Sequence, residues 1–141
     1  MKKTIRRTFS LCVVVVLCMA VALTVSAAVG TKTAEEYGRL LAQCSQNTSN
    51  PYILNTSTRI AINNKDACLG MHLDIWELGG TTALYTFTSE PGDLLLARDI
   101  PLYTAIDFEP ERVFSSHYII DPNTGGYLYE VELCEVLSFS N

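Results

Sequence analysis

Basic residues are scarce in this sequence once its first segment is set aside. Four of the ten Lys and Arg residues stand at the start, at Lys2, Lys3, Arg6 and Arg7, which leaves six against 15 acidic residues in the rest, a net charge of −9. A surface of this charge repels phosphate, which argues against a nucleic-acid binder. The 141 residues fit one domain and leave no room for the second domain or dinucleotide fold that many enzymes need.

The sequence also lacks an apolar run long enough to cross a bilayer as a helix. Its longest run, residues 11–25, has about 15 residues, whereas a spanning helix needs about 20. The basic start, this run and the small residues Val25, Ser26, Ala27 and Ala28 follow the order of a secretory signal peptide. We expect residues 1–27 to be a signal peptide of bacterial type, cleaved after Ala27 or Ala28, and the rest to be secreted. An uncleaved membrane anchor is the alternative.

Cysteine is scarce beyond this segment, with only Cys44, Cys68 and Cys134. Export favours one disulfide and leaves one thiol over, and three pairings are possible. The order Cys68, Trp76, Cys134 is that of an immunoglobulin domain, but Trp76 follows too soon and Glu132 stands where that fold has a tyrosine. Both Cys68 and Cys134 fall on the less apolar faces of their expected strands. A Cys68–Cys134 disulfide would therefore tie neighbouring strands on an outer face.

The segment 28–57 shows the one helical pattern. Apolar residues at helical spacing and a capping box formed by Thr33 and Glu36 predict a short helix over residues 33–44. The stretch 45–57, rich in Ser, Thr and Asn, predicts a linker.

From residue 58 onward the apolar residues recur with a period of two. Turn-forming residues at 63–66, 89–93 and 121–126 divide the segment into about seven expected strands. These cover residues 58–62, 66–78, 82–88, 94–100, 104–109, 112–120 and 127–139. The spacing predicts an all-β domain over 58–141, an antiparallel sandwich or barrel.

Residues 121–132 resemble the calcium loop of an EF-hand. The resemblance implies calcium ligands at Asp121, Asn123 and Glu132. Gly125 stands where the loop has an oxygen ligand, and the preceding segment favours a strand. We therefore expect a hairpin turn over 121–126, with Gly126 at a positive φ and Glu132 carried about 20 Å along the strand.

No catalytic motif is present, although Ser115, Ser116 and His117 are close in sequence. A hydrolase would need His117 within hydrogen-bond reach of one of these serines or Cys134, with a carboxylate beside it.

The strongest candidate site is the less apolar face of the strand expected over 66–78, which carries His72, Asp74 and Trp76. If this face is open, Trp76 beside Asp74 is suited to stack on a sugar or to anchor a partner; if a second layer covers it, Trp76 belongs to the core. The sequence thus predicts a secreted, non-enzymatic binding module for a protein or a cell-surface glycan, with no cofactor. The alternatives are a small secreted hydrolase or hydrolase inhibitor, and a calcium-stabilised extracellular domain.

Overall fold

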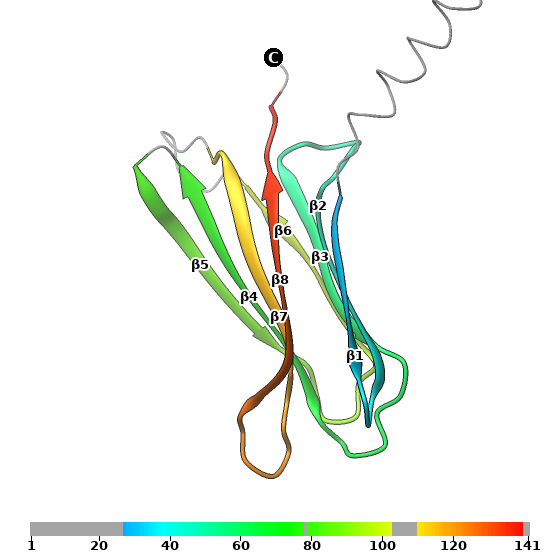
Figure 1. Cartoon of the computed structure of the whole chain (residues 1–141). Helices are drawn as coiled ribbons and strands as arrows, with labels where there is room; N and C mark the ends of the chain where they lie inside the picture. Colours follow the sequence, from blue (N-terminus) through cyan, green and yellow to red (C-terminus); the bar gives the residue numbers. More distant parts are fainter. Residues whose placement is uncertain (1–26, 78, 103–109, 140–141) are drawn as a thin grey trace, which may run out of the picture.

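The structure, a computed structural model, describes residues 27–77, 79–102 and 110–139 as an all-β fold of eight strands (Figure 1). The strands form two four-stranded sheets, with the orders β1-β2-β3-β6 and β5-β4-β7-β8, and all neighbours pair antiparallel. Their bounds are β1 Ala28–Ala34, β2 Gly38–Gln46, β3 Ile53–Ile60, β4 Cys68–Glu77, β5 Gly80–Thr88, β6 Leu95–Pro101, β7 Arg112–Ile120 and β8 Tyr127–Val136. The predicted all-β antiparallel sandwich is confirmed at this level.

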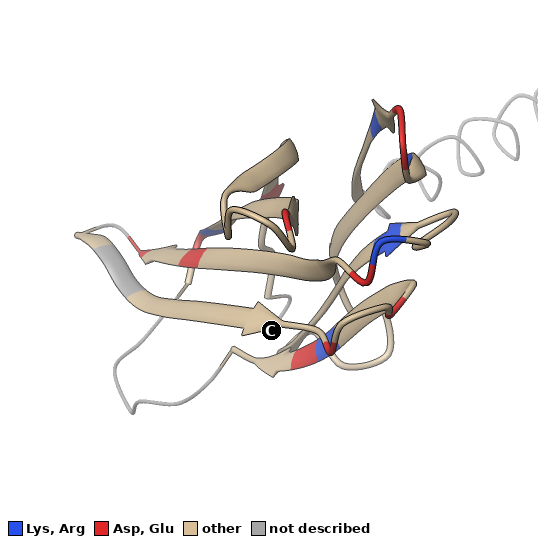
Figure 2. Ribbon diagram, turned by 90° about the horizontal axis from the view of Figure 1, so that it is seen from below, with Lys and Arg blue, Asp and Glu red and all other residues tan. Residues whose placement is uncertain are grey.

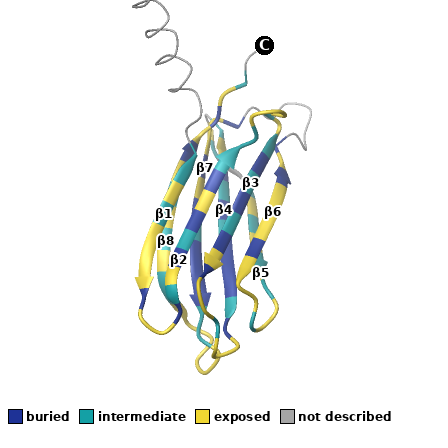
Figure 3. Cartoon of the chain, turned by 90° about the vertical axis from the view of Figure 1, so that its right-hand side faces the viewer, coloured by how far each residue is buried: buried dark blue, intermediate teal, exposed yellow. Residues whose placement is uncertain are grey.

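The core lies between the two sheets and is built from alternate residues of each strand. In β4 the inward side chains are Leu69, Met71, Leu73 and Ile75, all at most 1% exposed. Buried and more exposed residues alternate in the same way along β2 and β3 (Figure 3). This period of two is the geometry of a strand with one covered face, and in β4 it agrees with the apolar alternation of the sequence.

The edge strands β1 and β8 belong to different sheets but pack against each other (Figure 3). A Cβ atom at Gly30 of β1 would collide with the side chains of Val131 and Leu133 in β8. Because glycine has no side chain, it lets the two strands approach closely here. One side of the sandwich is closed by this contact.

The predicted helix over residues 33–44 is wrong. These residues form the end of β1, a turn in which the Tyr37 N–H donates to the Ala34 carbonyl at 2.9 Å, and most of β2. Leu40, Ala42 and Cys44 are buried at intervals of two, and Gly38 takes a φ of 76° in the turn. A short apolar run fits the helical period of 3.6 as well as the strand period of two, and here hydrogen bonding to neighbouring strands selects the strand.

The expected linker 45–57 likewise contains the end of β2 and the start of β3, so residues 28–57 are part of the sandwich. Five later strands, β4 to β8, match expected ones within about three residues at each end, in line with the usual uncertainty of strand ends. The strand expected over 104–109 lies outside the described residues.

The turn between β7 and β8 is the predicted hairpin. The Asp121 N–H donates to the Gly126 carbonyl and the Gly125 N–H donates to the Asp121 carbonyl, each at 2.8 Å. The glycine at positive φ is Gly125, at 71°, and Gly126 is not at a positive φ. The expectation for Gly126 was therefore wrong by one residue.

Replacing Gly125 by alanine should lower the free energy of unfolding by about 1 kcal/mol, because a Cβ is strained at this φ. Gly126→Ala is the matched control and should cost less, since its φ suits any residue. Urea unfolding of the two variants measures the difference. A larger loss in Gly126→Ala would contradict this turn geometry.

Candidate functional site

The outer face of the β5-β4-β7-β8 sheet carries the candidate site, and we call it the Trp76 face. It is formed by the outward residues of four strands: Leu84 and Thr86 of β5, His72, Asp74 and Trp76 of β4, Arg112, Phe114 and Ser116 of β7, and Glu132, Cys134 and Val136 of β8. Trp76 is 38% exposed and Phe114 39% exposed, while Leu84 and Val136 are more exposed still. Trp76 is thus on the surface and not in the core.

A shallow depression of about 390 Å³ lies at the end of this face. Its lining is Asp74, Trp76, Glu77, Gly80, Glu111, Arg112 and Phe114. The rings of Trp76 and Phe114 meet edge to face, with centroids 5.7 Å apart and an interplanar angle of 73°. This is a favoured geometry for an aromatic pair, so the two rings hold each other in place at the surface.

His72 fixes the position of Asp74 at the wall of the depression. Its Nδ1 atom lies 2.8 Å from the Thr86 hydroxyl, and its Nε2 atom lies 2.8 Å from Asp74 Oδ1. Asp74 Oδ1 is shielded from solvent and forms no well-aligned hydrogen bond with any described residue, so the contact with His72 is an ion-pair approach only. The three residues predicted as a site therefore do lie together, with His72 supporting the carboxylate beside Trp76.

Apart from Asp74, which His72 contacts, the charged groups of the depression make no ion pair within the described part of the chain. Asp74, Glu77 and Glu111 supply carboxylates and Arg112 supplies one guanidinium. Within the described parts of the chain, Arg112, Glu77 and Glu111 make no ion pair with one another or with other side chains. Three acids against one base give the depression a negative charge, together with donors and acceptors that remain available to a ligand.

Sequence reasoning missed Phe114, Arg112 and Glu111. The register of β4 with β7 places Phe114 opposite Asp74 and Arg112 opposite Trp76. Glu111 is held beside them because its N–H donates to the Trp76 carbonyl at 2.7 Å. The sequence of β7 has apolar residues on both faces, so its alternation does not reveal which residues face outward. Only pairing with β4 decides that Phe114 lies beside Trp76.

The serine and histidine of the hydrolase alternative are sealed inside the sandwich. His117 Nε2 lies 3.0 Å from Ser115 Oγ and its Nδ1 lies 2.7 Å from Thr58 Oγ1, and all three residues are buried. Thr58 Oγ1 also donates to the Gly70 carbonyl at 3.3 Å, so it accepts from His117 Nδ1–H, and Nε2 accepts from Ser115. A threonine stands where a hydrolase would need a carboxylate. This arrangement satisfies buried polar groups and gives no route to a substrate.

The three cysteines are free thiols in the structure. Strand β7 lies between β4, which carries Cys68, and β8, which carries Cys134. In the strand register Cys68 is opposite Ile120 of β7, and Cys134 is opposite Phe114 of β7. Six residues of β7 separate the two positions, about 20 Å along the strand, whereas bonded cysteines have Cα atoms about 4.4–6.8 Å apart. The structure therefore does not bring together the predicted Cys68–Cys134 pair.

The residues implied as calcium ligands are also separated. Asp121 and Asn123 lie in the hairpin turn, whereas Glu132 lies along β8, opposite Ser116. The Asp121 carboxylate accepts hydrogen bonds from the Asn123 N–H and the Thr124 hydroxyl, each at 2.9 Å, and these bonds lower its pKa. No group of three or more His, Cys, Asp or Glu side chains suited to a metal occurs among the described residues.

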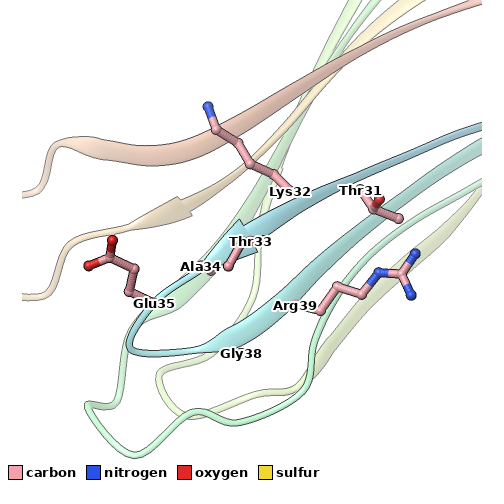
Figure 4. A pocket seen from close by; sticks show the side chains of 7 residues that line it. All are labelled: Thr31, Lys32, Thr33, Ala34, Glu35, Gly38 and Arg39. Carbon is pink, nitrogen blue, oxygen red and sulfur yellow. The ribbon is translucent and has the colours of Figure 1, made fainter.

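A second depression, of about 340 Å³, lies at the β1–β2 turn and is lined by Thr31, Lys32, Thr33, Ala34, Glu35, Gly38 and Arg39 (Figure 4). In this view the side chain of Lys32 points away from those of Thr31 and Arg39, so the lining side chains do not converge on one point. Around the whole fold the few Lys and Arg residues are interspersed with Asp and Glu (Figure 2). These features give no second candidate.

Burial lowers the pKa of His117 to about 4 from its ordinary 6.5. The unfolded chain therefore binds a proton at a higher pH than the folded protein, and protonation favours unfolding. From pH 6.5 down to pH 4 the protein should lose about 3 kcal/mol of stability through this histidine. Urea unfolding across this range measures the loss. His117→Gln should remove this change of unfolding free energy with pH. The variant thereby separates the effect of His117 from that of Glu135, whose pKa is raised by burial. An unchanged pH dependence in His117→Gln would contradict the assignment to this histidine.

Thiol reactivity should distinguish Cys134 from Cys44. Cys134 is exposed, whereas Cys44 is buried and burial raises its pKa to about 12. A thiol reagent should modify Cys134 rapidly in the native protein and Cys44 only after unfolding, and Cys134→Ser should remove the rapid phase. Only one reactive thiol in the denatured, unreduced mature chain would mean that a disulfide forms after all.

No helix within the described ranges is both long and apolar enough to traverse a lipid bilayer. Comparison of the chain with protein-family models, with curated proteins and with solved structures found no match.

Proposed function

We propose that this chain is an exported, non-enzymatic binding module and that the depression on its Trp76 face holds a neutral glycan. The observation that carries the proposal is the exposed indole of Trp76, held by Phe114 beside the side chains of Glu77, Glu111 and Arg112, which make no ion pair among the described residues. A large aromatic ring on the surface of an isolated domain leaves apolar area in contact with water. A ligand that covers it gains the free energy of removing that area from solvent.

The chemistry of the depression fits a pyranose sugar. One face of such a ring presents C–H groups, which pack on an indole, and its edge presents hydroxyl groups. Asp74, Glu77 and Glu111 accept hydrogen bonds from hydroxyls, and Arg112 donates to them. Hydrogen bonds to ionised groups are stronger than those between neutral groups, so a few of them fix the orientation of the sugar.

The charge of the depression selects among glycans. Three carboxylates and one guanidinium repel sulfated, phosphorylated or uronic-acid chains at close range, since like charges in a binding site cost several kcal/mol. A neutral polysaccharide or oligosaccharide avoids this cost. Exposed Leu84 and Val136 extend the apolar area of the same face, which is why a protein partner is the competing outcome of the test.

Two further features support the proposal. The Ser115–His117 pair is buried and lacks a carboxylate, which favours binding over hydrolysis. The basic start, the apolar run and the small residues before Ala28 favour export, where cell-surface glycans are met.

Trp76→Ala should weaken the binding of a neutral glycan at least about tenfold, because a central aromatic commonly contributes more than about 1.4 kcal/mol. A screen of neutral and anionic glycans followed by titration calorimetry measures the effect. Tyr127→Ala is the matched control: this aromatic is 64% exposed but lies at the opposite end of the same sheet, opposite Ile120, and its loss should leave affinity unchanged.

Three outcomes would overturn the glycan assignment. The first is that no neutral glycan binds, and the second is that Trp76→Ala binds as well as the unaltered protein. The third is capture of a protein through the same face, with loss on Trp76→Ala, which would make the chain a protein-binding module instead.

A further inference from the structure

A carboxylate is buried at the seam between the two sheets. Glu135 of β8 points inward and is 3% exposed. No Lys, Arg or His in the described segments lies within ion-pair distance of it. A buried carboxylate without a counter-charge is costly, because the protein interior solvates the charge poorly. Glu135 is thus a charge that the folded strands leave without a positive partner.

The atoms that do reach Glu135 are backbone nitrogens of the other sheet. The Ala28 N–H, at the first residue of β1, donates to Glu135 Oε2 at 3.1 Å. The Gln46 N–H, at the end of β2, donates to the same carboxylate. Burial raises the pKa of Glu135, and these two hydrogen bonds only partly offset that effect. An ammonium group in place of one of these amides would supply the missing charge.

We propose that the Ala27–Ala28 peptide bond is the processing site of the exported chain, and that the α-amino group freed at Ala28 forms an ion pair with the carboxylate of Glu135. The inference rests on the proposed export of the chain. The reaction is hydrolysis by the endopeptidase that removes signal peptides. Water cleaves the C–N bond, its oxygen stays on the Ala27 carboxylate, and the α-amino group takes up a proton. An α-amino group is ordinarily protonated below about pH 8, and a neighbouring carboxylate favours the protonated form.

Geometry distinguishes this bond from the next one. Cleavage after Ala28 would move the ammonium one residue along β1, about 3.8 Å away. Successive N–H groups of a strand also point to opposite edges. The Ala28 N–H points toward Glu135, so the N–H of Val29 points away from it. An uncleaved chain keeps a neutral amide at 3.1 Å. Of the three possible starts, only Ala28 gives Glu135 its counter-charge.

The ion pair also gives processing a physical consequence. It joins the first residue of β1 to β8, across the side of the sandwich that these two edge strands close (Figure 1). Removal of the preceding segment therefore stabilises the mature fold, by replacing a neutral hydrogen bond with a charge-assisted one.

The first experiment is N-terminal sequencing of the protein purified after export from a bacterial host, which should start at Ala28. The second compares thermal melts of the mature chain starting at Ala28 with one starting at Gly-Ala28, in which the ammonium is displaced by one residue. All eight strands and the described core lie within residues 28–139, so both chains contain the whole described fold. The glycine-extended chain should melt about 5 °C lower, as expected for a domain of this size when one such interaction is lost.

The Glu135→Gln variant tests whether this carboxylate is responsible. It should melt lower than the unaltered protein and show no difference between the two starts, since it has no charge to pair. Glu132→Gln, an exposed position on the other face of β8, is the matched control and should keep the full difference. If Glu135→Gln does not fold, the melting temperatures of the Ala28 and Gly-Ala28 chains with Glu135 unaltered still test the ion pair.

A mature start at Val29, an uncleaved product, or equal melting of the two starts would overturn the inference, and so would a difference that persists in Glu135→Gln. These results are independent of glycan binding, because Glu135 faces the interior and Trp76 faces outward. A failed glycan screen would leave the ion pair standing, and equal melting of the two starts would leave the Trp76 face untouched.

Discussion

Strand β4 is the element on which the rest of the structure depends. Its inward residues, from Leu69 to Ile75, are fully buried against the opposite sheet, and its backbone pairs with β5 on one side and β7 on the other. Burial of each such side chain contributes about 1.5–3 kcal/mol, so this one strand supplies a large part of the driving force for folding. Its outward residues carry the candidate site. The rigid inner face thereby fixes the positions of His72, Asp74 and Trp76, which elements held only by loops would not do.

The core also contains polar groups, and each is bonded to another part of the fold. Thr58 and His117 join β3 to β7 across the interface between the sheets, and Thr58 also bonds to the Gly70 carbonyl of β4. Glu135 is reached from β1 and β2 through Ala28 and Gln46. A slip of either sheet would break these bonds and leave polar groups buried without partners. They therefore set the relative position of the sheets more strictly than apolar contacts alone.

Stability and proposed binding are separated by the two faces of one sheet. The inner face of the β5-β4-β7-β8 sheet makes the core, while its outer face exposes Trp76 and Phe114 at the cost of some apolar area in water. Proteins accept this cost where a ligand covers the exposed area. Three features support the proposed binding over catalysis. They are the exposed Trp76–Phe114 pair, the side chains of Glu77, Glu111 and Arg112 that make no ion pair among the described residues, and the burial of the Ser115–His117 pair.

The sequence by itself determined the strands from β4 onward, the β7–β8 hairpin and the inward residues of β4, because a period of two with turn residues between strands is a local signal. It did not determine β1 and β2, since Leu40 and Cys44, four residues apart, share one face of a helix as readily as one face of a strand, and only pairing with β3 decides between them. The neighbours of Trp76 and the separation of Cys68 from Cys134 came from register, which depends on contacts between residues far apart in the chain. Whether the Trp76 face is open, and that the nitrogen of Ala28 meets Glu135, followed only from how the two sheets pack, because no local pattern encodes which surfaces the rest of the chain covers.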